Sequence, residues 1–99
     1  MLHIVNKSHR QTTSLASALR LAKPGHALLL TEDAVFAATR AGAESSGIGA
    51  ALSRHKVYVL QPDVEARGMA GKLVEGVTAV DYGGFVDLVA EHSTNQSWL

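Results

Sequence analysis

Three aspartates are the first residues of this sequence whose type and position suggest chemistry. Asp33, Asp63 and Asp81 each follow closely on an apolar segment expected to form a strand. The carboxyl ends of parallel strands meet at one edge of a sheet, and ligands bind at that edge in open α/β folds. Carboxylates gathered there could ligate a metal ion or serve as a general acid and base. An aspartate in this position more simply caps the following helix by accepting its free N–H groups, so we expect capping.

The other residue types that carry chemistry follow no catalytic pattern. The glycine-rich segment from Gly42 to Gly49 follows a predicted helix, whereas a dinucleotide fingerprint follows a strand, so we expect a flexible surface loop. The chain has no cysteine, which excludes disulfides and thiolate chemistry. No serine lies in a strained nucleophile turn. We therefore expect no catalytic residue, no metal and no cofactor. The five histidines show no close metal-ligand spacing: His3, His9, His26, His55 and His92.

The elements that must position these residues are predicted by four short apolar runs. The runs are continuous rather than alternating, and helical patterns separate them, which is typical of a parallel sheet covered on both faces. The sequence therefore predicts an α/β fold, a Rossmann-like three-layer sandwich with a mainly parallel sheet, in a single domain spanning residues 1–99. The predicted strands are residues 2–5, 26–31, 56–60 and 77–80, and the last is followed by a helix that Asp81 caps.

The composition limits the kinds of partner and environment that we expect for this chain. The longest apolar runs, residues 27–30 and 57–60, are far shorter than the roughly 18 residues that span a bilayer. Residues 1–7 do not have the basic and apolar pattern of a secretory signal, so we expect a cytoplasmic protein without a membrane segment. The formal net charge is zero, which argues against direct binding of nucleic acid, because phosphate contacts draw on clustered Lys and Arg.

Aromatic residues near the C-terminus are the best candidates for contacts with another protein. Tyr82, Phe85 and Trp98 are three of the five aromatic residues of the chain. A chain this small does not easily shelter all of them, and aromatic anchors dominate interface energies. We therefore predict a partner interface at Tyr82, Phe85 and Trp98, with Trp98 docking either onto this domain or into the partner.

Four motifs, in order along the chain, resemble the TusB/DsrH family. Each motif alone is weak, but together they extend over the whole length of the sequence. The motifs are Leu2-His3 with Val5-Asn6-Lys7-Ser8, Val57-Tyr58-Val59-Leu60 with Pro62-Asp63 and Ala66-Arg67-Gly68, Val80-Asp81-Tyr82-Gly83-Gly84-Phe85-Val86-Asp87-Leu88, and Ser97-Trp98-Leu99.

The resemblance implies a DsrE-like fold and a cytoplasmic, non-catalytic subunit of a sulfur relay. Two homologous subunits, TusC/DsrF-like and TusD/DsrE-like, would complete a heterohexamer, and one of them would carry the cysteine that holds the persulfide. In the Tus form the relay supports 2-thiolation of the wobble uridine of tRNA, and in the Dsr form it feeds dissimilatory sulfur oxidation. Members of the Dsr type carry a cysteine in the first helix, near Ala18 here, and its absence favours the Tus form.

Two alternatives remain open at this point. One is a DsrH-type subunit of a complex in dissimilatory sulfur oxidation. The other is a free-standing α/β module that binds a small ligand at the carboxyl edge of its sheet, although acidic residues at that edge would repel phosphate.

Overall fold

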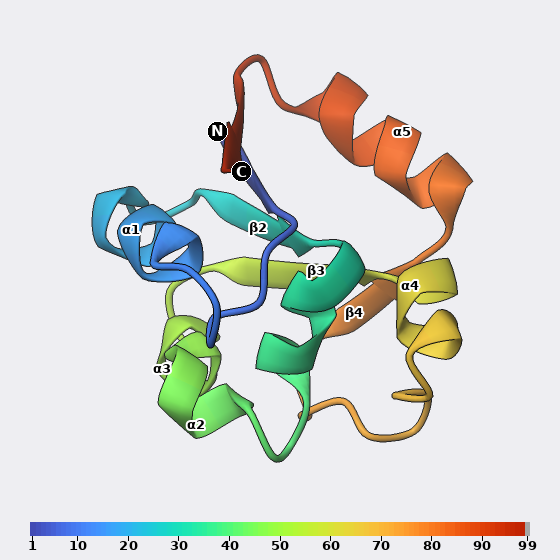
Figure 1. The fold of residues 1–99 in the computed structure, drawn as a ribbon. Helices are drawn as coiled ribbons and strands as arrows, with labels where there is room; N and C mark the ends of the chain where they lie inside the picture. Colours follow the sequence, from blue (N-terminus) through green and yellow to red (C-terminus); the bar gives the residue numbers. More distant parts are fainter. Residues whose placement is uncertain (99) are drawn as a thin grey trace.

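The computed structural model describes residues 1–98, and Leu99, which closes the terminal motif above, lies outside the described residues. Within residues 1–98 there are five strands and six helical segments (Figure 1). In order they are β1 (Leu2–Val5), α1 (Ser14–Leu21), β2 (Ala27–Leu30), the 3-10 helix η1 (Glu32–Ala38), α2 (Ala43–Ser46), α3 (Ile48–Ala51), β3 (Lys56–Leu60), α4 (Gln61–Ala66), β4 (Thr78–Val80), α5 (Tyr82–Glu91) and β5 (Asn95–Trp98).

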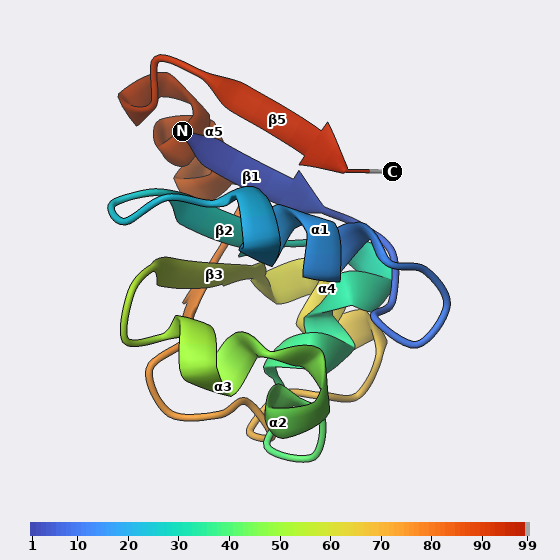
Figure 2. The same ribbon diagram turned by 90° about the vertical axis from the view of Figure 1, so that its left-hand side faces the viewer.

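All five strands are parallel and form one sheet in the order β4-β3-β2-β1-β5. The expected Rossmann-like fold with a mainly parallel sheet is confirmed. The four predicted strands are all present, but sequence patterns did not reveal β5. This strand pairs with β1 at the edge of the sheet, with Leu2 opposite Asn95 and Val5 opposite Trp98. Figure 2 shows β5 beside β1 as the outermost strand.

The two faces of the sheet are covered unequally. One face packs against α1, η1, α3 and α4 around a large cluster of buried side chains that includes Leu28 and Leu30. The opposite face packs against α5, around the smaller cluster of Leu2, Ala27, Leu29 and Leu88. Figure 1 shows α5 on one side of the sheet, with α1 and α3 on the other. Strand β2 is buried on both faces, which explains its uninterrupted apolar sequence.

The prediction of a flexible loop over Gly42–Gly49 is wrong. The segment forms most of α2 and α3, and the side chains of Ser46 and Ile48 are buried. Gly47 ends α2 in the left-handed conformation at a φ of 86°, which favours glycine. The Ser46 hydroxyl donates a hydrogen bond to the carbonyl of Ala37 at 2.9 Å and fixes the segment against η1. The glycines therefore end and join short helices.

None of the helices within residues 1–98 is both long enough and apolar enough to cross a membrane.

Candidate functional site

All three predicted aspartates follow strands of the parallel sheet and lie at its carboxyl edge, and an arginine joins two of them. Arg67 Nε donates to Asp33 Oδ1 at 2.8 Å, and Arg67 Nη1 lies 3.8 Å from Asp63 Oδ1. Asp63 Oδ2 also accepts a 2.7 Å hydrogen bond from the backbone N–H of Glu32. Both carboxylates therefore have partners within the chain.

The capping prediction is confirmed for Asp81 and wrong for Asp33 and Asp63. Asp81 precedes α5, and its Oδ1 accepts a 2.8 Å hydrogen bond from the backbone N–H of Gly84. Asp33 lies inside η1, whereas Asp63 lies inside α4 because β3 runs directly into that helix at Leu60. The carboxylate of Asp63 instead binds the first N–H of the neighbouring η1.

The carboxylates do not form a metal site. Among residues 1–98, no group of three or more His, Cys, Asp or Glu side chains is placed to hold a metal ion. Asp81 caps α5 and takes no part in the hydrogen bonds that link Asp33, Asp63 and Arg67. The charged network stabilises the junction between η1 and α4.

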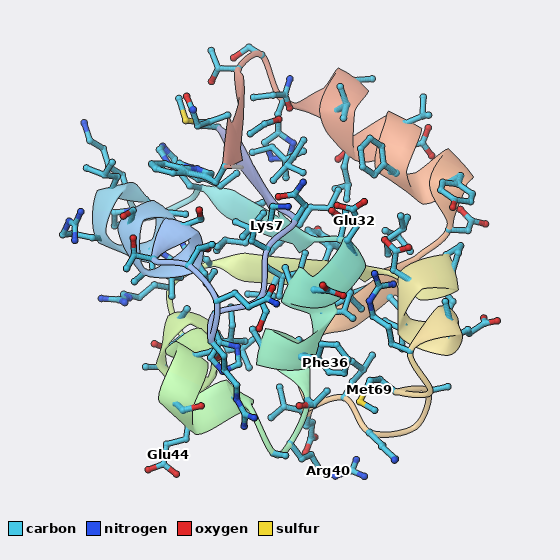
Figure 3. The ribbon with its side chains drawn as sticks, viewed as in Figure 1. Lys7, Glu32, Phe36, Arg40, Glu44 and Met69 are labelled. Atoms are coloured by element: carbon cyan, nitrogen blue, oxygen red, sulfur yellow. The ribbon has the colours of Figure 1, made fainter. Side chains whose placement is uncertain are left out.

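A hollow of about 320 Å³ lies at the same edge of the sheet. Its walls come from segments that follow the carboxyl ends of β1, β2 and β3 and include the apolar side chains of Phe36 and Met69. Figure 3 shows these two side chains next to each other. Ser8, His9 and Arg10 add polar groups to the lining.

His9 is the most distinctive group of this hollow. The Ser45 hydroxyl donates to the carbonyl of Gly42 at 3.3 Å, and His9 Nε2 lies 3.3 Å from the same hydroxyl oxygen. His9 Nδ1 is buried without a hydrogen-bond partner among the described residues. Burial, with a smaller contribution from the charge of Arg10, lowers the pKa of His9 and favours the neutral ring.

Another buried side-chain atom without a hydrogen-bond partner follows the same strand. Asn6 Oδ1 has no hydrogen-bond partner within the part of the chain that the structure describes. Unsatisfied buried acceptors are uncommon in native proteins. The carboxyl edge can thus accommodate an apolar group and accept hydrogen bonds, but its lining includes no thiol. Sequence reasoning missed this site, because its residues come from distant segments and share no spacing.

The three aromatic residues predicted at a partner interface do not form one patch. The side chain of Tyr82 is 64% exposed, and that of Val86, one turn further along α5, is equally exposed. Phe85 is partly buried against the smaller core cluster under α5. Trp98 packs against the larger cluster on the opposite face of the sheet, and its indole N–H donates to His3 Nδ1 at 3.1 Å. The interface role of these residues stays a prediction.

Comparisons with known proteins identify relatives over almost the whole chain. Residues 7–95 match the family described as DsrH like protein. The chain is 36% identical over 98 residues to the protein TusB of Escherichia coli O81 (strain ED1a), covering 99% of this chain and 100% of that protein. The protein TusB of Pectobacterium parmentieri is 38% identical over the same length and coverage.

Two solved structures share the fold. The ychN protein from E. coli superimposes with a TM-score of 0.80 at 19% identity, covering 97% of each chain. The protein MTH1491 from Methanobacterium thermoautotrophicum, described as of unknown function, gives a TM-score of 0.73 at 19% identity over 97% of this chain and 95% of the other.

Proposed function

Since the chain belongs to the TusB/DsrH family, we propose that it serves as a sulfur-relay subunit that supports 2-thiolation of the tRNA wobble uridine without carrying sulfur itself. One observation carries the proposal: this family member, a chain of 99 residues, contains no cysteine. Sulfur transfer through a persulfide requires a thiolate, so the thiol must come from another subunit.

The partners in this proposal are a TusC/DsrF-like and a TusD/DsrE-like subunit, and the assembly is a cytoplasmic heterohexamer. The small size of the chain and the exposed Tyr82 and Val86 on α5 support a role in assembly. The carboxyl-edge hollow near His9 would help to shape the groove around a partner's cysteine. Its apolar walls, Phe36 and Met69, would limit the access of water to the persulfide.

The absence of cysteine near Ala18 is the reason for preferring tRNA thiolation over sulfur oxidation. Ala18 lies on the inner face of α1 and is fully buried in the larger core cluster. Deleting the gene for this chain should lower the 2-thiouridine content of cellular tRNA, as measured by mass spectrometry of nucleosides, and restoring the gene should recover it. An unchanged 2-thiouridine content would contradict this part of the proposal and favour the Dsr type.

The isolated chain is expected to accept no sulfur from a persulfide donor, because it offers no thiol. Transfer is measured as a mass shift of the intact protein after the donor has been removed. Ala50→Cys is the matched control, since Ala50 is exposed on α3 and the new thiol is accessible to the donor. A stable sulfur adduct on the unaltered chain would refute the prediction, whereas an adduct on the Ala50→Cys variant alone would support it.

A further inference from the structure

A second hollow lies at the opposite, amino edge of the sheet and takes no part in the proposed relay function. It has a volume of about 460 Å³, within the range of small-molecule sites. Its lining residues lie where β2 and β3 begin and at the end of α5. Its polar lining comes from residues far apart in the sequence. Those with ionisable nitrogen or carboxylate groups are His26, Arg54, His55, Lys56, Glu91 and His92.

The hydrogen bonds around this hollow define which ring nitrogen carries hydrogen in each of its three histidines. His55 Nδ1 lies 3.0 Å from the carbonyl of His26, and His92 Nδ1 lies 2.8 Å from the carbonyl of Leu88. Because a carbonyl only accepts, both Nδ1 atoms carry hydrogen, and each Nε2 is left as the basic nitrogen. His26 has the opposite tautomer. Its Nδ1 accepts a hydrogen bond from the backbone N–H of Lys23 at 3.2 Å, so its hydrogen is on Nε2.

A second chain of hydrogen bonds gives the same assignment for His26. Trp98 donates its indole hydrogen to His3 Nδ1, so the hydrogen of His3 lies on Nε2 and points to His26 Nδ1, 3.0 Å away. His26 Nδ1 therefore accepts from both the backbone N–H of Lys23 and the ring of His3. Among residues 1–98, none of the hydrogen bonds formed by these rings uses Nε2 of His26, His55 or His92.

The charges around the hollow are mainly positive. Arg54 and Lys56 are exposed, and neither forms an ion pair within residues 1–98, where the ion pairs belong to Arg67. Glu91 is the acidic residue of the lining, and the Tyr58 hydroxyl is uncharged. Burial, followed by the charges of the N-terminus, His55 and Lys23, lowers the pKa of His26. A bound anion would offset this repulsion at His26.

We propose that this hollow binds a small tetrahedral oxyanion, such as sulfate or phosphate, between Arg54, Lys56 and the histidine rings. The Nε2–H of His26 supplies a neutral donor beside the two cationic side chains, Arg54 and Lys56. A divalent cation does not fit, because Arg54 and Lys56 would repel it, and the described residues include no metal-binding group of three side chains.

The test is titration of the full chain with sulfate and, in parallel, with phosphate, at constant ionic strength set with chloride. Nuclear magnetic resonance follows the imidazole signals of His26, His55 and His92. We expect saturable shifts that are larger and occur at lower anion concentration at about pH 6 than at about pH 8, because the His26 ring gains charge as the pH falls. Sulfate is the more direct probe of the rings, since its own charge is constant over this range.

Two double variants distinguish this site from general attraction to positive charge. Arg54→Gln with Lys56→Gln should weaken binding by about 10-fold or more, because two charge-assisted contacts are lost. The control variant, Arg40→Gln with Lys72→Gln, removes the same amount of positive charge from the lining of a different hollow. It should leave the affinity for the anion nearly unchanged. Both pairs are exposed, so thermal unfolding should confirm that each variant folds. Equal losses in the two variants, or no saturable shift with either anion at about pH 6, would overturn the proposal. Saturation by one anion only would identify which oxyanion the site accepts and would support it.

Discussion

Replacing Tyr82 and Val86 together by serine is expected to weaken association with the homologous subunits by about 100-fold, or about 3 kcal/mol. Both side chains are 64% exposed and lie one turn apart on α5, so they form a continuous apolar surface. Serine has nearly the helix propensity of tyrosine and valine, so the helix itself should be little affected. Co-purification of the co-expressed subunits, followed by titration of the purified chains, measures the effect.

Leu21→Ser is the matched control for this pair. Leu21 is also apolar and exposed, at 57%, but it ends α1 on the opposite face of the sheet. It should leave association unchanged, and the thermal unfolding of all these variants should be close to that of the unaltered chain. Full association by the Tyr82 and Val86 variant would exclude α5 from the interface. An equal loss in Leu21→Ser would indicate a general effect of exposed apolar surface.

Trp98→Ala is expected to lower the free energy of unfolding of the isolated chain by about 2 kcal/mol, less than the ~3 to 5 kcal/mol typical of fully buried aromatic residues. The ring packs against the larger core cluster and its N–H binds His3, so the change removes both packing and a hydrogen bond. Trp98→Phe retains a ring and loses the hydrogen bond, and should cost about 1 kcal/mol. Denaturant unfolding followed by circular dichroism measures both values.

The pH dependence of unfolding gives this prediction a second readout. Burial, then the charges of His26, the N-terminus and His55, lowers the pKa of His3 below its ordinary value of 6.5. Between the lowered pKa and 6.5 the unfolded chain binds more protons than the folded chain, so stability falls as the pH falls through this window. Trp98→Ala exposes His3 and should reduce this slope. His9 and His26 also have lowered pKa values, so part of the slope should remain.

An unchanged unfolding free energy in Trp98→Ala would show that β5 contributes little to the isolated domain. If association with the partners were lost at the same time, Trp98 would act as the partner anchor that the sequence predicts.

The fold could be predicted from the sequence where burial determines residue type. Strands β1, β2 and β3 are largely buried, so their apolar runs were visible. Strand β5 was not, because Asn95, Gln96 and Ser97 are exposed at the edge of the sheet and only backbone pairing with β1 makes them a strand. The helices α2 and α3 were missed because four-residue segments are too short to show a helical period.

The candidate sites were less accessible to sequence reasoning. The carboxyl-edge position of Asp33 and Asp63 followed from the strand order, but their shared partner Arg67 did not, because an ion pair depends on side-chain geometry. The histidines at the amino edge come from separate elements, and no spacing in the sequence relates His26, His55 and His92. Of the predicted aromatic residues, only Tyr82 has a largely exposed side chain.

The pairing of β5 with β1 also constrains how the protein folds. The first strand forms half of its hydrogen-bonded ladder with β2, but the other half requires residues 95–98. Bringing such distant segments together carries a loop-closure cost, and contacts of this kind slow folding. During synthesis on the ribosome, one edge of β1 therefore stays unpaired until residue 95 has been made. The completed sheet, and with it the contact of Trp98 with His3, is a late event in the life of each new chain.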